Sequence, residues 1–126
     1  MDRVVLDTSV LIAAEPVTGE LDAAISAVSI AELHFGLLVA DDASRPLRAA
    51  RLGWIESHFA SLPVDDLVAR EWGRLQAAVA SRGGQPRRRA ADLAIAATAN
   101  VHQARLLTHN LKDFAIISDL VDAASP

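Results

Sequence analysis

Two hydrophobic periodicities alternate along the chain. Short apolar or β-branched runs bounded by polar residues predict buried strands, whereas apolar positions three and four residues apart predict helices. By the first criterion, strands are expected at residues 3–6, 24–28, 61–64, 105–108 and, as an edge strand, 114–117. By the second, helices are expected at 29–40, at 44–59, from a cap at Asp65 or Asp66 through Val79, and at 88–102. Strands that alternate with helices indicate an α/β protein, a three-layer α/β/α sandwich around a central, mainly parallel sheet.

Acidic residues stand at two places that such a sheet would bring together. Asp7 directly follows the first predicted strand, and ligands of open α/β sheets bind at the carboxyl ends of the strands. Glu32 lies in the predicted helix that follows the second strand, which ends at the same edge. Each residue has a purely structural alternative. Asp7 is a possible helix N-cap, and Ser29 with Glu32 matches a capping box.

Two further acids lie in the second half of the chain. Asp92 sits in the almost wholly apolar run Ala90 to Ala99, where an unpaired buried carboxylate is costly, so a compensating partner is expected. Asp113 follows the predicted strand 105–108, where a solvated turn residue is an equally good interpretation. Thr8 and Ser9 are expected to orient Asp7 or to contact a phosphate at a helix start, with ordinary N-capping as the alternative.

The four carboxylates together support a metal site. Acids brought within a few ångströms cannot all stay ionised without cations. Oxygen-only sites suit Mg²⁺ or Mn²⁺, which activate water and neutralise charge on a scissile phosphate. The predicted chemistry is therefore metal-dependent phosphodiester hydrolysis.

Composition narrows the function classes. With 52% hydrophobic and 22% charged residues in 126, a single folded domain over residues 1–126 is expected, and disorder is not. Cysteine is absent, which excludes disulfides and thiolate chemistry. We expect a cytoplasmic protein without a membrane anchor, because no run approaches the roughly 18 apolar residues of a membrane span and the apolar start lacks a basic leader.

The net charge of −4 by itself speaks against nucleic-acid binding, but the basic residues are unevenly distributed. Arginine forks grip phosphates bidentately, so Arg87, Arg88 and Arg89 are candidate RNA contacts, with a solvated surface as the alternative. Arg45, Arg48 and Arg51 have the spacing of an exposed helix face, and we favour that interpretation for them.

Four stretches in series, Val5 to Ile12, Ser29 to Leu33, Asp92 to Ala99 and Leu107 to Phe114, resemble the PIN-domain ribonucleases. The likeness is greatest to the VapC-type toxins of prokaryotic toxin-antitoxin pairs, and it spans nearly the whole chain. It implies a Mg²⁺- or Mn²⁺-dependent endoribonuclease with Asp7, Glu32 and Asp92 in the first three acidic positions. Some members carry an acid where this sequence has Asn110, so we assign Asp113 to the fourth position and Asn110 to a neutral contact. Thr108 matches the polar residue of that strand end.

The resemblance also implies partners. These are an RNA substrate, a cognate VapB-type antitoxin, and a second copy of the chain, with a heterotetramer or larger assembly formed with the antitoxin. Growth arrest by a block of translation would follow from the cleavage.

Three other functions fit the sequence less well. A catalytically idle binding module of the same fold is disfavoured by acids at all four positions. An aspartate-based phosphotransfer enzyme is disfavoured because Ser9 stands where an Asp-x-Asp pattern needs its second acid, and because Lys112 is the only lysine. Metal-free histidine chemistry is disfavoured because the four histidines lack dyad spacing, although His109 falls within the fourth motif and is a candidate RNA contact.

Overall fold

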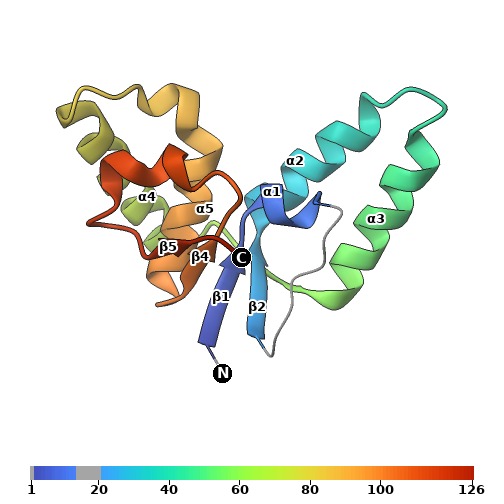
Figure 1. Ribbon diagram of the computed structural model, residues 1–126, viewed down its shortest axis with the longest axis horizontal. Helices are drawn as coiled ribbons and strands as arrows, with labels where there is room; N and C mark the ends of the chain where they lie inside the picture. The colour runs from blue at the N-terminus through green and yellow to red at the C-terminus, as the bar shows by residue number, and fades with distance from the viewer. Residues whose placement is uncertain (1, 14–20) are drawn as a thin grey trace.

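The computed structural model describes residues 2–13 and 21–126. Its centre is a five-stranded sheet in the order β3-β2-β1-β4-β5, in which every neighbouring pair is parallel (Figure 1). The strands are β1 (Asp2–Leu6), β2 (Leu21–Ser26), β3 (Ala60–Leu62), β4 (Arg105–Leu107) and β5 (Ala123–Ala124). The predicted α/β class with a parallel sheet is confirmed.

Helices connect the strands and cover both faces of the sheet. The α-helices are α1 (Thr8–Leu11), α2 (Ala27–Leu38), α3 (Arg45–His58), α4 (Asp66–Ser81) and α5 (Ala90–Val101), and the 3₁₀ helices are η1 (Pro86–Arg89) and η2 (Leu111–Ile117). In Figure 1, α4 and α5 lie to one side of the strands and α1, α2 and α3 to the other. No helix in the described part of the chain is long and apolar enough to cross a membrane.

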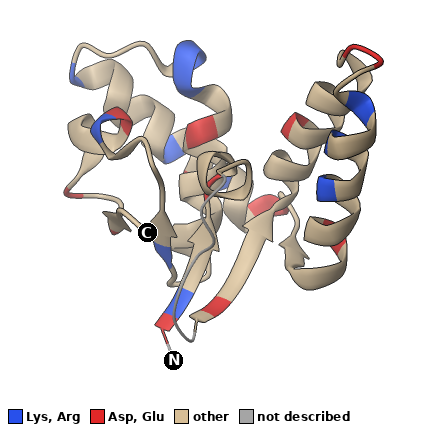
Figure 2. Cartoon of the chain, turned by 45° about the vertical axis from the view of Figure 1, so that its right-hand side comes forward, with Lys and Arg blue, Asp and Glu red and all other residues tan. Residues whose placement is uncertain are grey.

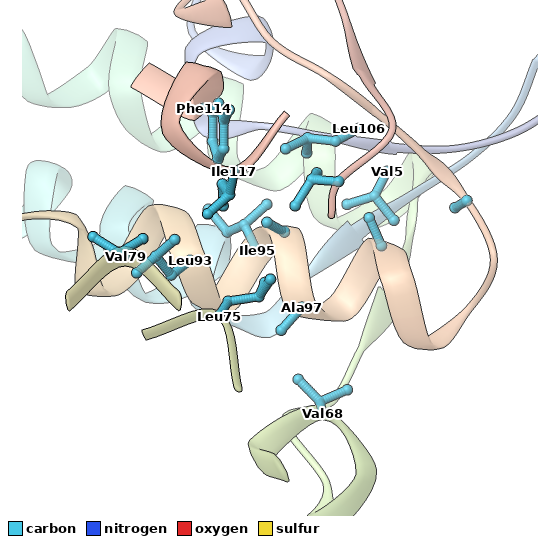
Figure 3. Close-up of a cluster of buried hydrophobic side chains, with 14 residues drawn as sticks. Val5, Val68, Leu75, Val79, Leu93, Ile95, Ala97, Leu106, Phe114 and Ile117 are labelled. Carbon is cyan, nitrogen blue, oxygen red and sulfur yellow. The ribbon is translucent and has the colours of Figure 1, made fainter. Parts of the chain in front are cut away.

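The alternation of side chains along β1 divides the core into two halves. Val5 packs with α4, α5 and η2 in a cluster that includes Leu75, Ile95 and Phe114 (Figure 3). Val4 and Leu6 point to the other face, where they join a cluster of residues from α1, β2, α3 and β4. Successive residues of a strand face opposite sides, and both faces are covered at Val4 to Leu6, so this buried part of β1 is apolar at every position.

The last predicted strand is wrong. Residues 114–117 belong to the 3₁₀ helix η2, and the edge strand is β5 further along, where Ala123 pairs with Leu106 of β4. In a 3₁₀ helix, side chains three residues apart eclipse. Phe114 and Ile117 are therefore buried on the same side of η2, and their spacing was mistaken for part of a continuous apolar strand.

Two predicted helix starts also change. Ser26, not Ser29, caps α2: its hydroxyl accepts a hydrogen bond of 3.0 Å from the backbone N–H of Val28, so the predicted capping box does not exist. The predicted helix 88–102 opens with the 3₁₀ turn η1 before α5 begins at Ala90. The cap at Asp65 is confirmed, because its carboxylate accepts from the N–H of Val68 at 3.0 Å. Pro16 and Gly19 also predict a loop between the first two strands, and both residues lie outside the described part of the chain.

The strand order places a topological switch next to the first acid. From β1 the chain continues to β2 and β3 on one side, then returns to pair β4 with the other side of β1. The ends of β1 and β4 therefore lie side by side, and the backbone N–H of Asp7 donates to the carbonyl of Leu107 at 2.9 Å. Ligand sites of open α/β sheets form at this kind of switch.

Candidate active site

Asp7 is held at the switch point by two hydroxyls. Its side chain makes no helix-cap hydrogen bond, so the N-cap alternative does not account for it. Instead, its Oδ2 accepts hydrogen bonds from Ser9 at 2.7 Å and from Thr108 at 2.9 Å. Asp7 is only 4% exposed, so this pair fixes a carboxylate that has little access to bulk water. The second oxygen, Oδ1, is free of these two contacts.

Glu32 of α2 accepts a hydrogen bond from Thr8 of α1. The Thr8 hydroxyl lies 2.7 Å from Oε1 of Glu32 and 2.9 Å from the hydroxyl of Ser29. Because a carboxylate only accepts, the proton of Thr8 goes to Glu32. Glu32 is in the second turn of α2, too far into the helix to reach back to a cap, which removes its structural alternative.

Asp92 carries the clearest electrostatic signal. It lies in the first turn of α5, and its pKa is raised from 3.8 to about 6, first by burial and then by the negative charges of Asp7, Glu32 and Asp113. A carboxylate pKa rises when like charges stand nearby, because each disfavours ionisation of the others. Three carboxylates from separate parts of the sequence are therefore close enough to Asp92 for their charges to affect it.

Asp113 is paired with a residue of the same region. Its Oδ1 lies 2.8 Å from Nη1 of Arg89, and both side chains are partly exposed. The charge of Asp113 contributes to the raised pKa of Asp92, and its assignment as the fourth acid stays a prediction. Asn110 contributes a backbone N–H that donates to the hydroxyl of Thr108 at 3.0 Å.

The donor set is right for Mg²⁺ or Mn²⁺, but the side chains do not form a closed metal site. In residues 2–13 and 21–126, no three carboxylate or histidine side chains are close enough together to share an ion. The four acids nonetheless offer oxygen ligands only, and the pKa of Asp92 is raised first by burial and then by neighbouring negative charges, an effect that a divalent cation would counter. Arg89 already neutralises part of that negative charge at Asp113.

The arginines singled out in the sequence lie in two separate regions. Figure 2 shows η1 as a basic turn at the start of α5, and Arg88 and Arg89 border a cavity that also reaches Asp113. Arg87 lies on the same turn but does not line that cavity. On the opposite side, Arg45 and Arg48 donate to the carbonyls of Ala40 and Gly36 near the end of α2. They join α2 to α3, which adds a structural role to the predicted exposed face.

Sequence reasoning misses two residues near the site. The sequence pattern predicts Ser29 as a cap, but Ser29 is fully buried and its hydroxyl lies 2.9 Å from that of Thr8. Lys112 was considered only as an unsuitable catalytic lysine, yet it lines the same cavity as Arg88. Its position next to Asp113 in the fourth motif was the available signal. His109 contributes its backbone N–H, which donates to the Ser9 hydroxyl at 3.0 Å.

Comparison with known proteins shows the family and agrees with the fold. The model of the PIN domain matches residues 4–120, which include all four acids. The chain belongs to the PIN-domain family. This PIN-domain chain is 41% identical over 122 residues to Ribonuclease VapC5 of Mycobacterium tuberculosis, with 90% of this chain and 86% of that protein covered.

Solved structures share the fold over nearly the whole PIN domain. VapBC-5 of Mycobacterium tuberculosis, a member of the VapBC family of toxin-antitoxin systems, superposes with a TM-score of 0.83 at 34% identity, covering 99% of this chain and 98% of that chain. FitAcB of Neisseria gonorrhoeae superposes with a TM-score of 0.77 at 26% identity, covering 98% and 97%. VapBC2 of Rickettsia felis, solved with a DNA fragment from its promoter, has a TM-score of 0.81 at 21% identity, covers 98% of both chains, and supports the fold alone.

Proposed function

We propose that this PIN-domain protein is an endoribonuclease that depends on Mg²⁺ or Mn²⁺. The observation that carries the proposal is the proximity of Asp92 to Asp7, Glu32 and Asp113, whose negative charges add to burial in raising the pKa of the Asp92 carboxyl. Asp7 stands at the switch point between β1 and β4, where a sheet of this topology binds ligands. A relative that is 41% identical carries the name ribonuclease, which favours RNA as the substrate.

In this proposal the carboxylates at this end of the sheet are the oxygen ligands available to the cation, and neighbouring hydroxyls orient two of them, Asp7 and Glu32. When bound, the cation lowers the pKa of an attacking water and neutralises charge on the phosphate. Ser9 and Thr108 occupy Oδ2 of Asp7 and leave Oδ1 for other contacts, while Thr8 fixes Glu32. Arg89 lies beside Asp113 and is a candidate contact for the RNA phosphate.

We further propose that the protein is the toxin of a toxin-antitoxin pair. Solved structures that share its fold include VapBC toxin-antitoxin complexes, one at 34% identity, which favours a VapB-type antitoxin as partner. Homodimerisation, a larger complex with the antitoxin, a block of translation and a cytoplasmic location all stay predictions from the family resemblance.

The direct test is cleavage of total RNA by the purified protein, with mapping of the cut ends. We expect cutting with Mg²⁺ or Mn²⁺, none with EDTA, and loss of cutting in Asp7→Asn and Asp92→Asn, which keep side-chain shape but remove ligand charge. Asp42→Asn is the matched control, because the Asp42 side chain is 99% exposed and lies outside the acid cluster. Wild-type cutting by folded Asp7→Asn and Asp92→Asn proteins would refute the proposal.

A further inference from the structure

A cavity of about 390 Å³ lies between η1 and η2, next to the acid cluster. We propose that this cavity, called here the η1–η2 pocket, binds one nucleotide of a single-stranded RNA beside the phosphodiester that is cut. The inference rests on the proposed function and extends it to a substrate subsite. The pocket is lined by Val79, Gly84, Gln85, Arg88, Arg89, Leu93, Lys112, Asp113, Ala115 and Ile116.

The lining of the pocket has an apolar part that suits the face of a nucleobase. Val79 comes from α4, Leu93 from α5, and Ala115 and Ile116 from η2. Gly84 packs tightly against two of these side chains, because a Cβ at this position would lie 2.6 Å from Cγ1 of Val79 and 3.0 Å from Cδ1 of Ile116. A pocket formed by three packed elements is more rigid than a loop surface, as a binding site for a base requires.

The rim of the pocket is cationic and available to phosphate. Arg88 and Lys112 are both exposed, and neither forms an ion pair within residues 2–13 and 21–126. Arg89 forms an ion pair with Asp113, with 2.8 Å between its Nη1 and the Oδ1 of the carboxylate. Unpaired cations around an apolar cavity match the chemistry of a nucleotide, which presents a flat base and a charged backbone.

Asp113 connects the pocket to the acid cluster. It lines the pocket and also contributes to the raised pKa of Asp92. A nucleotide in the pocket therefore lies next to the group of carboxylates that we assign to cleavage. The pocket is then in a position to select which base stands beside the cut.

A larger cavity of about 780 Å³ does not fit RNA. It lies at the other end of the sheet, where Asn100 and Gln103 mark the end of α5 and Ala104 precedes β4. Its Arg74 is paired with Glu71 at 2.7 Å, and Asp119 and Asp122 add negative charge to its lining. Cations that are already neutralised by acids of the same chain offer a polyanion little attraction.

Binding without cleavage tests the proposal. Short fluorescein-labelled single-stranded RNAs are titrated with EDTA-treated protein, and the dissociation constant is measured by fluorescence anisotropy at several salt concentrations. We expect Arg88→Gln and Lys112→Gln each to weaken binding several-fold and to reduce the salt slope by about 0.7, the value for one lost phosphate contact on a single strand. Arg70→Gln is the matched control, since Arg70 is exposed on α4 and does not line the pocket.

A second set of measurements tests insertion of the base. An abasic site is moved along the same RNA, and we expect one position to cost the wild-type protein affinity. Ala115→Leu should fill the pocket and abolish that penalty, and folding should be unaffected because Ala115 is exposed.

The outcomes separate this inference from the proposed function. Salt slopes of Arg88→Gln and Lys112→Gln equal to that of Arg70→Gln, or an abasic penalty unchanged by Ala115→Leu, would overturn the pocket. If cleavage requires Asp92 and either of these two results is found, the proposal for the pocket is refuted and the proposed function stands. Absence of metal-dependent cleavage by wild-type protein would refute the proposed function.

Discussion

The hydroxyl of Thr108 donates a hydrogen bond of 2.9 Å to Oδ2 of Asp7, across 101 positions of sequence and between the ends of two neighbouring strands. Thr108 is fully buried, and its oxygen also accepts the backbone N–H of Asn110 at 3.0 Å. This one side chain therefore fixes both the first acid and Asn110, the residue that precedes η2, the 3₁₀ helix that carries Asp113.

Thr108→Val should therefore affect stability and metal binding together. Valine keeps the shape of threonine but leaves the N–H of Asn110 and one contact of Asp7 unsatisfied, at a cost of about 1–2 kcal/mol in the free energy of unfolding. We expect urea denaturation to show this loss and calorimetry to show weaker binding of Mn²⁺. In Thr98→Val, the buried hydroxyl that is removed donates to Ala94 of its own helix, so stability should fall while Mn²⁺ affinity does not. Equal Mn²⁺ affinities of wild type and Thr108→Val would contradict the orienting role.

The pKa of Asp92 predicts a specific dependence of stability on pH. Because the pKa is raised from 3.8 to about 6 in the folded protein, that protein binds the proton more tightly than the unfolded chain does. The stabilisation is complete below pH 3.8 and is lost as the pH rises through about 6. Metal-free Asp92→Asn should therefore be more stable than wild type at neutral pH, by about 1 kcal/mol after allowance for solvent screening.

Thermal unfolding in EDTA at a series of pH values measures this effect. We expect the two melting curves to converge at acidic pH and to separate by about 3 °C at neutral pH. A variant that is less stable than wild type at neutral pH would show that the negative charge of Asp92 is compensated within the metal-free protein.

Addition of Mg²⁺ or Mn²⁺ should reverse that order. A ligand that binds only the folded state stabilises it by about 2.7 kcal/mol at a hundredfold excess over its dissociation constant. The wild-type melting temperature should rise by several degrees, and that of Asp92→Asn should rise much less, because the variant has lost a ligand charge. Sodium chloride at equal ionic strength is the control. Equal shifts with both salts would mean that only screening had been observed.

A pair of glycine substitutions tests the packing around the η1–η2 pocket. In Gly84→Ala, the new Cβ lies 2.6 Å from Cγ1 of Val79 and 3.2 Å from its carbonyl oxygen, so we expect a loss of about 1–3 kcal/mol. In Gly73→Ala, nothing lies within 4 Å and the position is inside helix α4, so we expect a gain of up to about 1 kcal/mol. Chemical denaturation compares the two. A Gly84→Ala protein as stable as wild type would show that the side chains of Val79 in α4 and Ile116 in η2 move aside easily, which would contradict a rigid pocket.

The sequence by itself determined most of the fold. Val4, Val5 and Leu6 are all apolar because both faces of the central strand are covered, and the alternation of such runs with helical patterns predicts a parallel sheet. It also singled out the four acids, because a carboxylate such as Asp92 in an apolar helix requires a compensating partner. Their shared location could be expected from the topology, since parallel strands end at the same edge.

Only the tertiary structure decided the details that depend on contacts between distant residues. The local pattern of Ser29 and Glu32 is that of a capping box, whereas packing makes Ser26 the cap and places Ser29 against Thr8. Residues 114–117 have strand-like composition, but burial of Phe114 and Ile117 on the same side favours a 3₁₀ helix and leaves the sheet edge to β5. Local propensities differ by a few tenths of a kcal/mol, which burial of a single large side chain exceeds.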